Sequence, residues 1–298
     1  MTLSRIIAAI IARTCTWMPD EIYLKIRYRL IMGRKLHLDN PQTFNEKINW
    51  LKINYRNPIL TSLVDKAEIK SVIKDVIGEK YLIPTLGVWD KFEDIDFYTL
   101  PQQFVLKSVN GGGGSGVFIC EDKSQINIEL VRRRLENSAR TNWKINREWA
   151  YYDVKPRFIA EKFMKNYDGS ELVDYKIMFF NGEPKVMFYA TERFVGKDTL
   201  KFDWYDMNLK HLPITSKGFG NKNQVISYFK QWDEMKEVGS KLAKHFNLPN
   251  VRVDFYLING QVYLGEMTFY HDAGFVPLEP EEWEYKIGSM MKLPTKYK

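Results

Sequence analysis

Two Asn-Gly pairs, at residues 181–182 and 259–260, constrain the fold of this chain more than any other feature. Each pair separates two short runs that are rich in apolar, aromatic and β-branched residues. The runs cover residues 172–180 and 184–191 in the first case and residues 251–258 and 261–267 in the second. Asn-Gly in such a position is typical of a two-residue hairpin turn, because both residues tolerate the positive φ angles that the turn requires. We therefore predict antiparallel hairpins in the second half of the chain.

Segments with helical spacing of apolar residues alternate with these strands. The clearest helix start is at Thr43, because Thr43 and Glu46 have the spacing of a capping box. Further helices are predicted at residues 64–77, 125–137 and 225–246, and further strands at residues 82–88, 104–109, 117–120 and 157–164. Strands in hairpins with helices between them predict an α+β protein.

Residues 1–60 are predicted to form a helical N-terminal extension. Its apolar run at residues 6–12 lies between Arg5 and Arg13 and is too short to span a bilayer. Two interpretations are open. The run forms a basic amphipathic helix that rests on the inner face of the cytoplasmic membrane, or it forms a helix that packs on the core.

The balance of charges restricts the class of partner. The chain carries 44 Lys and Arg residues against 37 Asp and Glu residues, a formal net charge of +7. This charge favours nucleotides, uronate sugars, nucleic acid or anionic lipid, without selecting among them. The two cysteines, Cys15 and Cys120, fit neither a metal site nor a disulfide framework, so we expect a cytoplasmic protein. The sequence leaves the oligomeric state open.

A glycine-rich loop separates the predicted strands at residues 104–109 and 117–120. Backbone without side chains can approach a polyphosphate closely and direct N–H groups at its oxygens. The loop is not a P-loop, because no Lys-Ser/Thr pair ends it and a strand follows it. A flexible linker is the alternative, but the flanking strands favour a flap over phosphates, with Lys107 as a fixed cation in the preceding strand. The loop consists of Gly111, Gly112, Gly113, Gly114, Ser115 and Gly116.

Two carboxylates lie on the strands that flank the second Asn-Gly turn. Pairing about the turn brings Asp254 and Glu266 near each other, and alternation places Arg252 on the same face as Asp254. Carboxylate oxygens are ligands that Mg²⁺ prefers, and two neighbouring carboxylates repel each other without a cation. The sequence therefore suggests a magnesium site, with solvent-facing carboxylates beside lysines as the alternative.

The order of these motifs resembles the ATP-grasp superfamily, and specifically its TupA-like branch. The resemblance extends from about residue 20 to the end of the chain and rests on order and spacing more than on any single motif. The segments that carry it are residues 41–50, 63–66, 81–84, 100–101, 104–107, 111–116, 161–164, 252–255, 265–266 and 288–294.

The resemblance implies an ATP-grasp fold, in which two α+β subdomains hold ATP between them. We expect an ATP-grasp domain over residues 61–298, with a flap subdomain at about 101–163 and a metal-binding subdomain at about 164–298. Lys66 and Lys107 would contact the phosphates beneath the glycine-rich loop, and Lys176 would add a further phosphate contact. Asp168 would bind the ribose. Adenine would contact a hinge formed by Glu161, Lys162, Phe163 and Met164.

The resemblance also implies roles at the reacting end of the nucleotide. Asp254 and Glu266 would hold Mg²⁺, and Arg252 would neutralise the negative charge that develops during phosphoryl transfer. ATP-grasp enzymes often have Asn two positions after the glutamate, whereas this chain has Thr268, a weaker ligand. The number of Mg²⁺ ions is therefore open.

The implied reaction joins a carboxylate to an amine. The carboxylate attacks the γ-phosphate of ATP to form an acyl phosphate, and the amine then displaces phosphate to give an amide. In this branch the resemblance points to the transfer of an amino acid or peptide to a uronic-acid glycan of capsule, O-antigen or teichuronopeptide. Such glycans are assembled on lipid carriers at the cytoplasmic face of the membrane, which would suit the basic N-terminal segment.

Two other functions compete with this hypothesis. A glycosyltransferase could hold a sugar nucleotide through a metal, and residues 94–96 contain the Asp-x-Asp pattern that such enzymes use. A nucleic-acid binder could use the basic residues at 132–134. The sequence has no nucleic-acid-binding motif, however, and we do not expect nucleic acid to bind.

Overall fold

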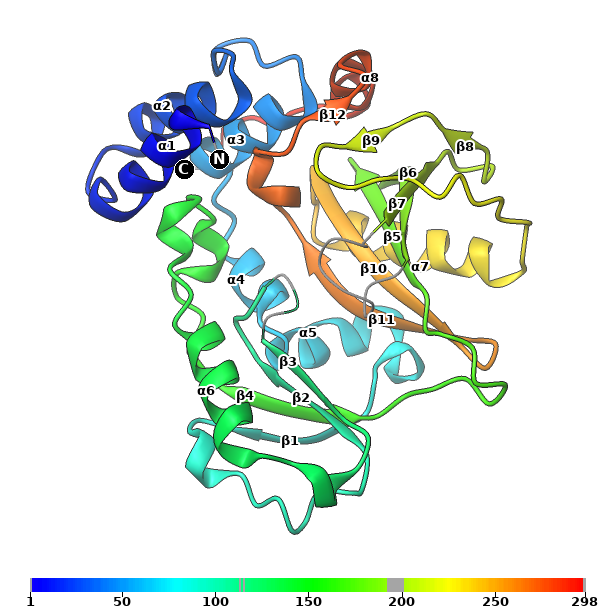
Figure 1. The fold of residues 1–298 in the computed structure, drawn as a ribbon. Coiled ribbons are helices and arrows are strands. Elements are labelled where there is room, and N and C mark those ends of the chain that lie inside the picture. The colour runs from blue at the N-terminus through cyan, green and yellow to red at the C-terminus, as the bar shows by residue number, and fades with distance from the viewer. Residues whose placement is uncertain (1, 113, 115, 192–200, 297–298) are drawn as a thin grey trace.

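The computed structural model describes residues 2–112, 114, 116–191 and 201–296. Over these residues the chain is an α+β protein with sheets of six, four and two strands (Figure 1). The helices are α1 Leu3–Thr14, α2 Asp20–Met32, α3 Phe44–Asn54, α4 Ile59–Val64, α5 Glu68–Ile77, α6 Ile128–Ala139, α7 Gln231–His245 and α8 Glu282–Met290. The strands are β1 Thr85–Trp89, β2 Phe104–Ser108, β3 Val117–Cys120, β4 Phe158–Lys162, β5 Asp174–Phe180, β6 Glu183–Thr191, β7 Lys201–Tyr205, β8 His211–Leu212, β9 Thr215–Ser216, β10 Asn250–Ile258, β11 Gln261–Thr268 and β12 Leu278–Glu279.

The six-stranded sheet is antiparallel and has the order β11-β10-β5-β6-β7-β8. Both predicted Asn-Gly turns are confirmed. Asn181, Gly182, Asn259 and Gly260 all have positive φ angles, between 50° and 84°, as the hairpin turn requires. Helix α7 packs on this sheet through its contacts with β5, β6, β10 and β11.

The four-stranded sheet has the order β1-β4-β2-β3 and carries α6 on one face (Figure 1). It has a hydrophobic core of its own, in which Phe104, Leu106 and Leu135 are fully buried. This sheet includes β1, which precedes residue 101, where the flap subdomain is expected to begin. The boundary of that subdomain stays a prediction. Residues 163–173 connect β4 of this sheet to β5 of the larger one.

The N-terminal helices are not separate from the rest of the fold. Tyr23 and Phe44 belong to the same hydrophobic core as the six-stranded sheet. The capping box at the start of α3 is confirmed, since Thr43 accepts from the Glu46 backbone and the Glu46 carboxylate accepts from the Thr43 backbone at 3.0 Å. Helix α3 thus forms part of the large core.

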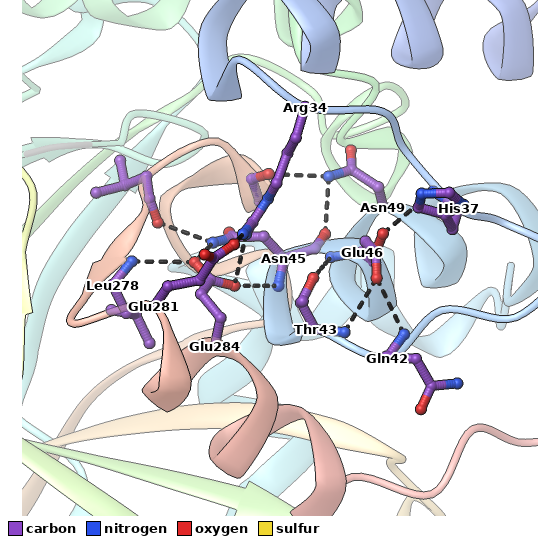
Figure 2. Close-up of polar contacts among 12 residues, drawn as sticks. Arg34, His37, Gln42, Thr43, Asn45, Glu46, Asn49, Leu278, Glu281 and Glu284 are labelled. Carbon is purple, nitrogen blue, oxygen red and sulfur yellow. Dashed lines mark hydrogen bonds and ion pairs between the residues drawn. The ribbon is translucent and has the colours of Figure 1, made fainter.

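Buried polar side chains join α3 to the C-terminal segment (Figure 2). The Asn45 side chain donates to the Glu284 carboxylate at 2.5 Å, and the same carboxylate accepts from the Leu278 backbone at 3.0 Å. Asn49 donates to the carbonyl of Gly274 at 2.9 Å. These hydrogen bonds fix α3 against α8 and against the chain that follows β11.

Several predicted element bounds are wrong. The helix expected at residues 64–77 is α5, which begins only at Glu68, and Val64 is the last residue of the preceding helix α4. The Asp65 carboxylate accepts from the backbone of Ala67 and Glu68 just before α5. The helix expected at 225–246 begins only at Gln231. Sequence periodicity also gives no indication of α8 or of the short strands β7, β8, β9 and β12, whose positions depend on contacts with distant segments.

No helix in the described ranges is long and apolar enough to cross a membrane.

Candidate functional site

A small pocket combines lysine side chains with apolar walls. Lys66, Lys70 and Lys107 line it together with Glu161, so three ammonium groups surround one carboxylate. The other walls come from Ile69, Ile73, Leu82, Ile83, Leu264 and Gly265. The surplus of positive charge suits a polyanion, and the apolar walls suit the faces of a planar base.

Strand pairing brings Lys107 and Glu161 together. Lys107 lies opposite Ile159 and Val105 lies opposite Glu161, so Lys107 and Glu161 are diagonal neighbours on one face of the sheet. The Glu161 carboxylate forms ion pairs with Lys107 through one oxygen and with Lys70 through the other. The cations of β2 and α5 are therefore held at a fixed spacing by one buried carboxylate.

The pKa shifts in this pocket reflect burial and neighbouring charges. Burial lowers the pKa of Lys66 and of Lys70, and the charge of Lys107 adds to both decreases. Burial alone would raise the pKa of Glu161, but Lys107 and Lys70 outweigh it and hold that pKa below its ordinary value. An incoming phosphate would favour the charged form of each lysine.

The glycine-rich loop lies at the tip of the β2–β3 hairpin, with three residues between it and Lys107. The carbonyl of Gly111 accepts from the Lys66 ammonium. A Cβ at Gly111 would lie 2.2 Å from the Ser108 hydroxyl, and a Cβ at Gly112 would lie 2.6 Å from the Trp143 ring. Gly114 has a φ of 77°, and a Cβ at Gly116 would also contact Ser108. The glycines are required for close packing, whereas Gly113 and Ser115 lie outside the described residues.

Asp254 and Glu266 are directly opposite each other on β10 and β11, as predicted. The pairing depends on a register shift between Asp254 and Phe255, where Gly265 is the extra residue of the bulge. Without this bulge Asp254 would lie opposite Gly265, and Glu266 would point to the other face of the sheet. The bulge therefore places both carboxylates on one face.

Arg252 connects the two carboxylates. Its Nε and Nη2 atoms lie 2.6 and 2.8 Å from the two oxygens of Asp254, and Nη2 lies 3.1 Å from Oε1 of Glu266. The Thr268 hydroxyl lies 3.5 Å from the same Glu266 oxygen. Burial opposes the charge on Arg252, but Asp254 and Glu266 outweigh it and raise the pKa of the guanidinium.

Lys176 extends this row of charges onto the neighbouring strand. It lies opposite Asp254 in the β5–β10 pairing, forms an ion pair with the Asp254 carboxylate, and lies 2.6 Å from Asp174. Asp254 is thus enclosed between Lys176 and Arg252 and is almost fully buried. Lys176 belongs to the carboxylate cluster, and its contact with a phosphate stays a prediction.

A second pocket joins the lysine pocket to the carboxylate pair. Lys66, Ile69 and Gly265 line both pockets, and the second is also lined by Glu266 and Tyr151. Tyr151 belongs to a short helical turn, Trp149–Tyr151, and stacks on Trp143 with 3.9 Å between ring centroids. Trp143 in turn donates to the carbonyl of Asn110, just before the glycine-rich loop. The two pockets therefore adjoin at Lys66, Ile69 and Gly265, and the glycine-rich loop contacts Lys66, which lines both.

The carboxylate pair fits a magnesium ion in its chemistry. Nη2 of Arg252 is within hydrogen-bonding distance of one oxygen from each carboxylate, so those oxygens are already directed at a common cation. Both are hard oxygen donors, as Mg²⁺ requires. Mg²⁺ prefers oxygens at about 2.0–2.1 Å, so its binding would displace contacts that Arg252 and Lys176 make with these oxygens.

The hinge and ribose residues are less directly connected to this space. Glu161 lines the first pocket, whereas Lys162, Phe163 and Met164 line neither of the two pockets in the part of the chain that is described. Asp168 is exposed, and the backbone of Ser170 donates to its carboxylate and lowers its pKa. Contacts of these four residues with adenine and ribose stay predictions.

Lys70, Tyr151 and Trp143 are site residues that the sequence reasoning did not identify. A signal for Lys70 was present, because it lies four residues after Lys66 at the start of a helical segment. Tyr151 and Trp143 follow no motif, and they reach the site through the packing of a loop.

The motifs of the competing functions lie outside the two pockets. Asp94 and Asp96 are exposed between β1 and β2 and line neither of the two pockets described above. Arg132 pairs with Glu93 and Glu136, and Arg133 pairs with Glu129 at 2.8 Å. Arg134 donates to the carbonyl of Gly114 at 3.4 Å, so the basic motif contacts the glycine-rich loop. The Asp-x-Asp motif does not contribute to the candidate site.

Comparison with known proteins agrees with the resemblance in the sequence. A family model described as TupA-like ATPgrasp matches residues 46–292. No curated protein matches the sequence.

Solved structures similar to this chain include three ligases or synthetases. D-alanine–D-alanine ligase from Bacillus anthracis complexed with ATP is 17% identical, with a TM-score of 0.42 and coverage of 71% of this chain and 55% of that one. L-amino acid ligase from Bacillus licheniformis is 13% identical, with a TM-score of 0.45 and coverage of 87% and 57%. N5-carboxyaminoimidazole synthetase from Staphylococcus aureus is 16% identical, with a TM-score of 0.40 and coverage of 70% and 44%. The chain thus spans about half the length of these proteins.

Proposed function

Because this chain belongs to the TupA-like ATP-grasp family, we propose that it is an ATP-dependent ligase that activates a carboxylate for attack by an amine. The observation that carries the proposal is that Lys66 and Gly265 line both pockets. This arrangement puts the lysines suited to a polyphosphate next to the carboxylates suited to Mg²⁺.

In the proposed complex, the base of ATP lies against the apolar wall that contains Ile73 and Leu264. Its phosphates extend along Lys70, Lys107 and Lys66 toward β11. The glycine-rich loop covers them, because its backbone approaches Lys66 without side chains in the way. This orientation directs the γ-phosphate at the second pocket.

The residues of β10 and β11 act at the reacting end. Asp254 and Glu266 would hold Mg²⁺, which when bound screens the charge of the phosphate oxygens. Arg252 contributes a guanidinium whose charge burial does not remove, since its carboxylate partners raise its pKa. It therefore neutralises the negative charge that grows on the transferred phosphoryl group.

Two displacements complete the proposed reaction. A carboxylate oxygen attacks the γ-phosphorus, the bond to the bridging oxygen of ADP breaks, and an acyl phosphate forms. The amine nitrogen then attacks the acyl carbon, phosphate leaves, and the nitrogen loses a proton to give the amide. No covalent bond to the enzyme is needed, and the second pocket, next to Glu266, is where we expect the carboxylate to lie.

For the substrates we propose a uronic-acid glycan as the carboxylate and an amino acid or peptide as the amine, in the synthesis of a cell-surface polysaccharide. Family membership and the net charge of +7 support an acidic acceptor.

A hydroxylamine assay tests the proposal. The purified protein is incubated with ATP, Mg²⁺, hydroxylamine and each of a panel of uronic acids, and hydroxamate and ADP are measured. Hydroxylamine intercepts an acyl phosphate, so we expect hydroxamate and ADP in equal amounts with the correct carboxylate and no amine added. The ligase proposal would be replaced by the glycosyltransferase alternative if none of the carboxylates supported ADP release and a sugar nucleotide released its nucleoside diphosphate.

A further inference from the structure

Helix α1 exposes one apolar face. Leu3, Ile6, Ile7 and Ile10 follow the 3, 4 and 7 spacing that places side chains on one side of a helix. Their exposed fractions lie between 39% and 72%. Trp17, which is 79% exposed, follows in the turn to α2. Large apolar side chains that gather in this way usually mark a surface for a partner.

The rest of α1 is seated on the protein. Ala8 and Ala12 are buried, Ile11 packs against the large core, and α1 contacts α2. The exposed face is therefore held in position and directed outward, because the small residues of the other face anchor the helix.

The charged side chains of α1 are both basic. Arg5 and Arg13 are exposed, and α1 contains no acidic residue. The next acidic residues along the chain are already paired: Asp20 with Arg147 at 2.8 Å and Glu21 with Lys25 at 2.6 Å. Across the described ranges, no ion pair involves Arg5 or Arg13.

We infer that α1 and the Trp17 turn form a docking surface for an anionic lipid bilayer. A helix of 12 residues cannot span a bilayer, but it can lie in the plane of the interface with its apolar face among the acyl chains. Exposed arginines of this helix attract anionic headgroups, and Arg13, three residues after Ile10, lies beside the apolar face. Tryptophan is enriched at the level of the headgroups.

Charge distinguishes the bilayer from a second copy of the chain. Two α1 faces in contact would bring their Arg13 side chains together without an acidic residue of α1 to pair with, whereas anionic lipid neutralises them. Helix α6 provides a contrast within the same chain. It also exposes Ile128 and Leu130, but Arg133 beside them is paired with Glu129.

The docking surface is coupled to the candidate site by hydrogen bonds. Tyr23 of α2 donates to the carbonyl of Ile145 at 2.9 Å, and Arg147 donates to the carbonyl of Met18 at 2.8 Å. The segment they hold continues to Tyr151 in the second pocket. A bilayer at α1 would therefore present a lipid-carried acceptor near that pocket. This consequence rests on the proposed function, whereas the docking surface does not.

Vesicle co-sedimentation tests the inference directly. The full chain is mixed with vesicles of phosphatidylcholine alone or of phosphatidylcholine with phosphatidylglycerol. We expect binding to the anionic vesicles only, and a decrease on the order of a hundredfold in the partition coefficient for Ile6→Glu/Ile10→Glu, because two apolar anchors become charged. Arg5→Gln/Arg13→Gln should decrease it on the order of tenfold.

Ile128→Glu/Leu130→Glu is the matched control and should bind as the unmodified chain does. Equal binding by the Ile6→Glu/Ile10→Glu variant, or equal binding to both kinds of vesicle, overturns the inference. So does an absence of vesicle binding together with a dimer, measured by light scattering, that this variant converts to a monomer. Hydroxamate formation with soluble substrates should be the same in all variants, so failure of the docking surface is separable from failure of the ligase proposal.

Discussion

Arg252 and Asp254, two residues apart on β10, form a two-point ion pair with nitrogen–oxygen distances of 2.6 and 2.8 Å. The same guanidinium lies 3.1 Å from Glu266 on the next strand. Arg252 therefore holds both carboxylates side by side in a site where Lys176 supplies a second cation. These cations offset the repulsion between the two neighbouring carboxylates.

Neutralising either carboxylate should abolish turnover. We expect Asp254→Asn and Glu266→Gln each to lower the rate of ADP release by a factor on the order of 100 or more, because the metal and Arg252 lose a charged partner. The fold should stay intact by circular dichroism. Glu183→Gln, an exposed carboxylate on β6, is the control. Near-normal rates in both site variants would show that the metal assignment is wrong.

Lys70 should contribute to nucleotide binding. Lys70→Ala removes one of three ammonium groups in the first pocket, so we expect the Kd for ATP to rise about five- to tenfold. Lys74→Ala, one turn further along α5, is the matched control, since Lys74 is half exposed and pairs with Glu79. Fluorescence titration with a labelled ATP analogue measures both. Equal affinities in the two variants would remove Lys70 from the site.

The sequence predicts the parts of the site that depend on local pattern. The turn at residues 259–260 fixes which strands pair, and alternation places Arg252 with Asp254. The glycine-rich loop lies between two short strands as its flanks indicate. These features follow from residues near one another in the chain.

Other parts depend on tertiary contacts and could not be predicted in this way. The bulge at Gly265 shifts the register by one residue, and simple counting from the turn does not reveal it. Asn45 and Asn49 have the composition of a solvated helix face, yet both are buried against residues more than 200 positions away. Helix α8 is short and highly charged, and its buried face is defined by contacts with α3 and β12.

Burial of His271 should make stability depend on pH. Burial lowers the pKa of this imidazole from 6.5 to about 4, and Arg252, 3.3 Å away, adds to the decrease. The unfolded chain therefore binds a proton below pH 6.5 that the folded chain does not bind until about pH 4. Stability should fall by about 3 kcal/mol as the pH decreases through this window.

Urea unfolding at several pH values measures this dependence. His271→Gln should remove much of the slope, whereas His245→Gln, which is exposed at the end of α7, should retain it. The same slope in the unmodified chain and in His271→Gln would contradict the assignment.

Gly288 should be essential for the contact between α8 and α3. A Cβ at this position would lie 2.2 Å from the Gln42 carbonyl and 2.9 Å from the Phe44 nitrogen, and both are backbone atoms that cannot move aside. We expect Gly288→Ala to lower the free energy of unfolding by about 1–3 kcal/mol. Ser289→Ala, the exposed neighbour, should have little effect in the same thermal unfolding experiment. Equal stability of the two variants would show that the helices can separate without cost.

Calorimetric titration with a non-hydrolysable ATP analogue, with and without Mg²⁺, tests the central claim most directly. We expect Mg²⁺-dependent binding to the unmodified chain and to Lys185→Ala, which changes a half-buried lysine on β6 that pairs with Glu183 and lines neither pocket. Lys107→Ala should weaken binding on the order of tenfold or more, because Lys107 lies at the base of the glycine-rich loop and lines the lysine pocket. Absence of nucleotide binding, or binding that neither Mg²⁺ nor Lys107→Ala affects, would contradict the assignment of ATP to this site.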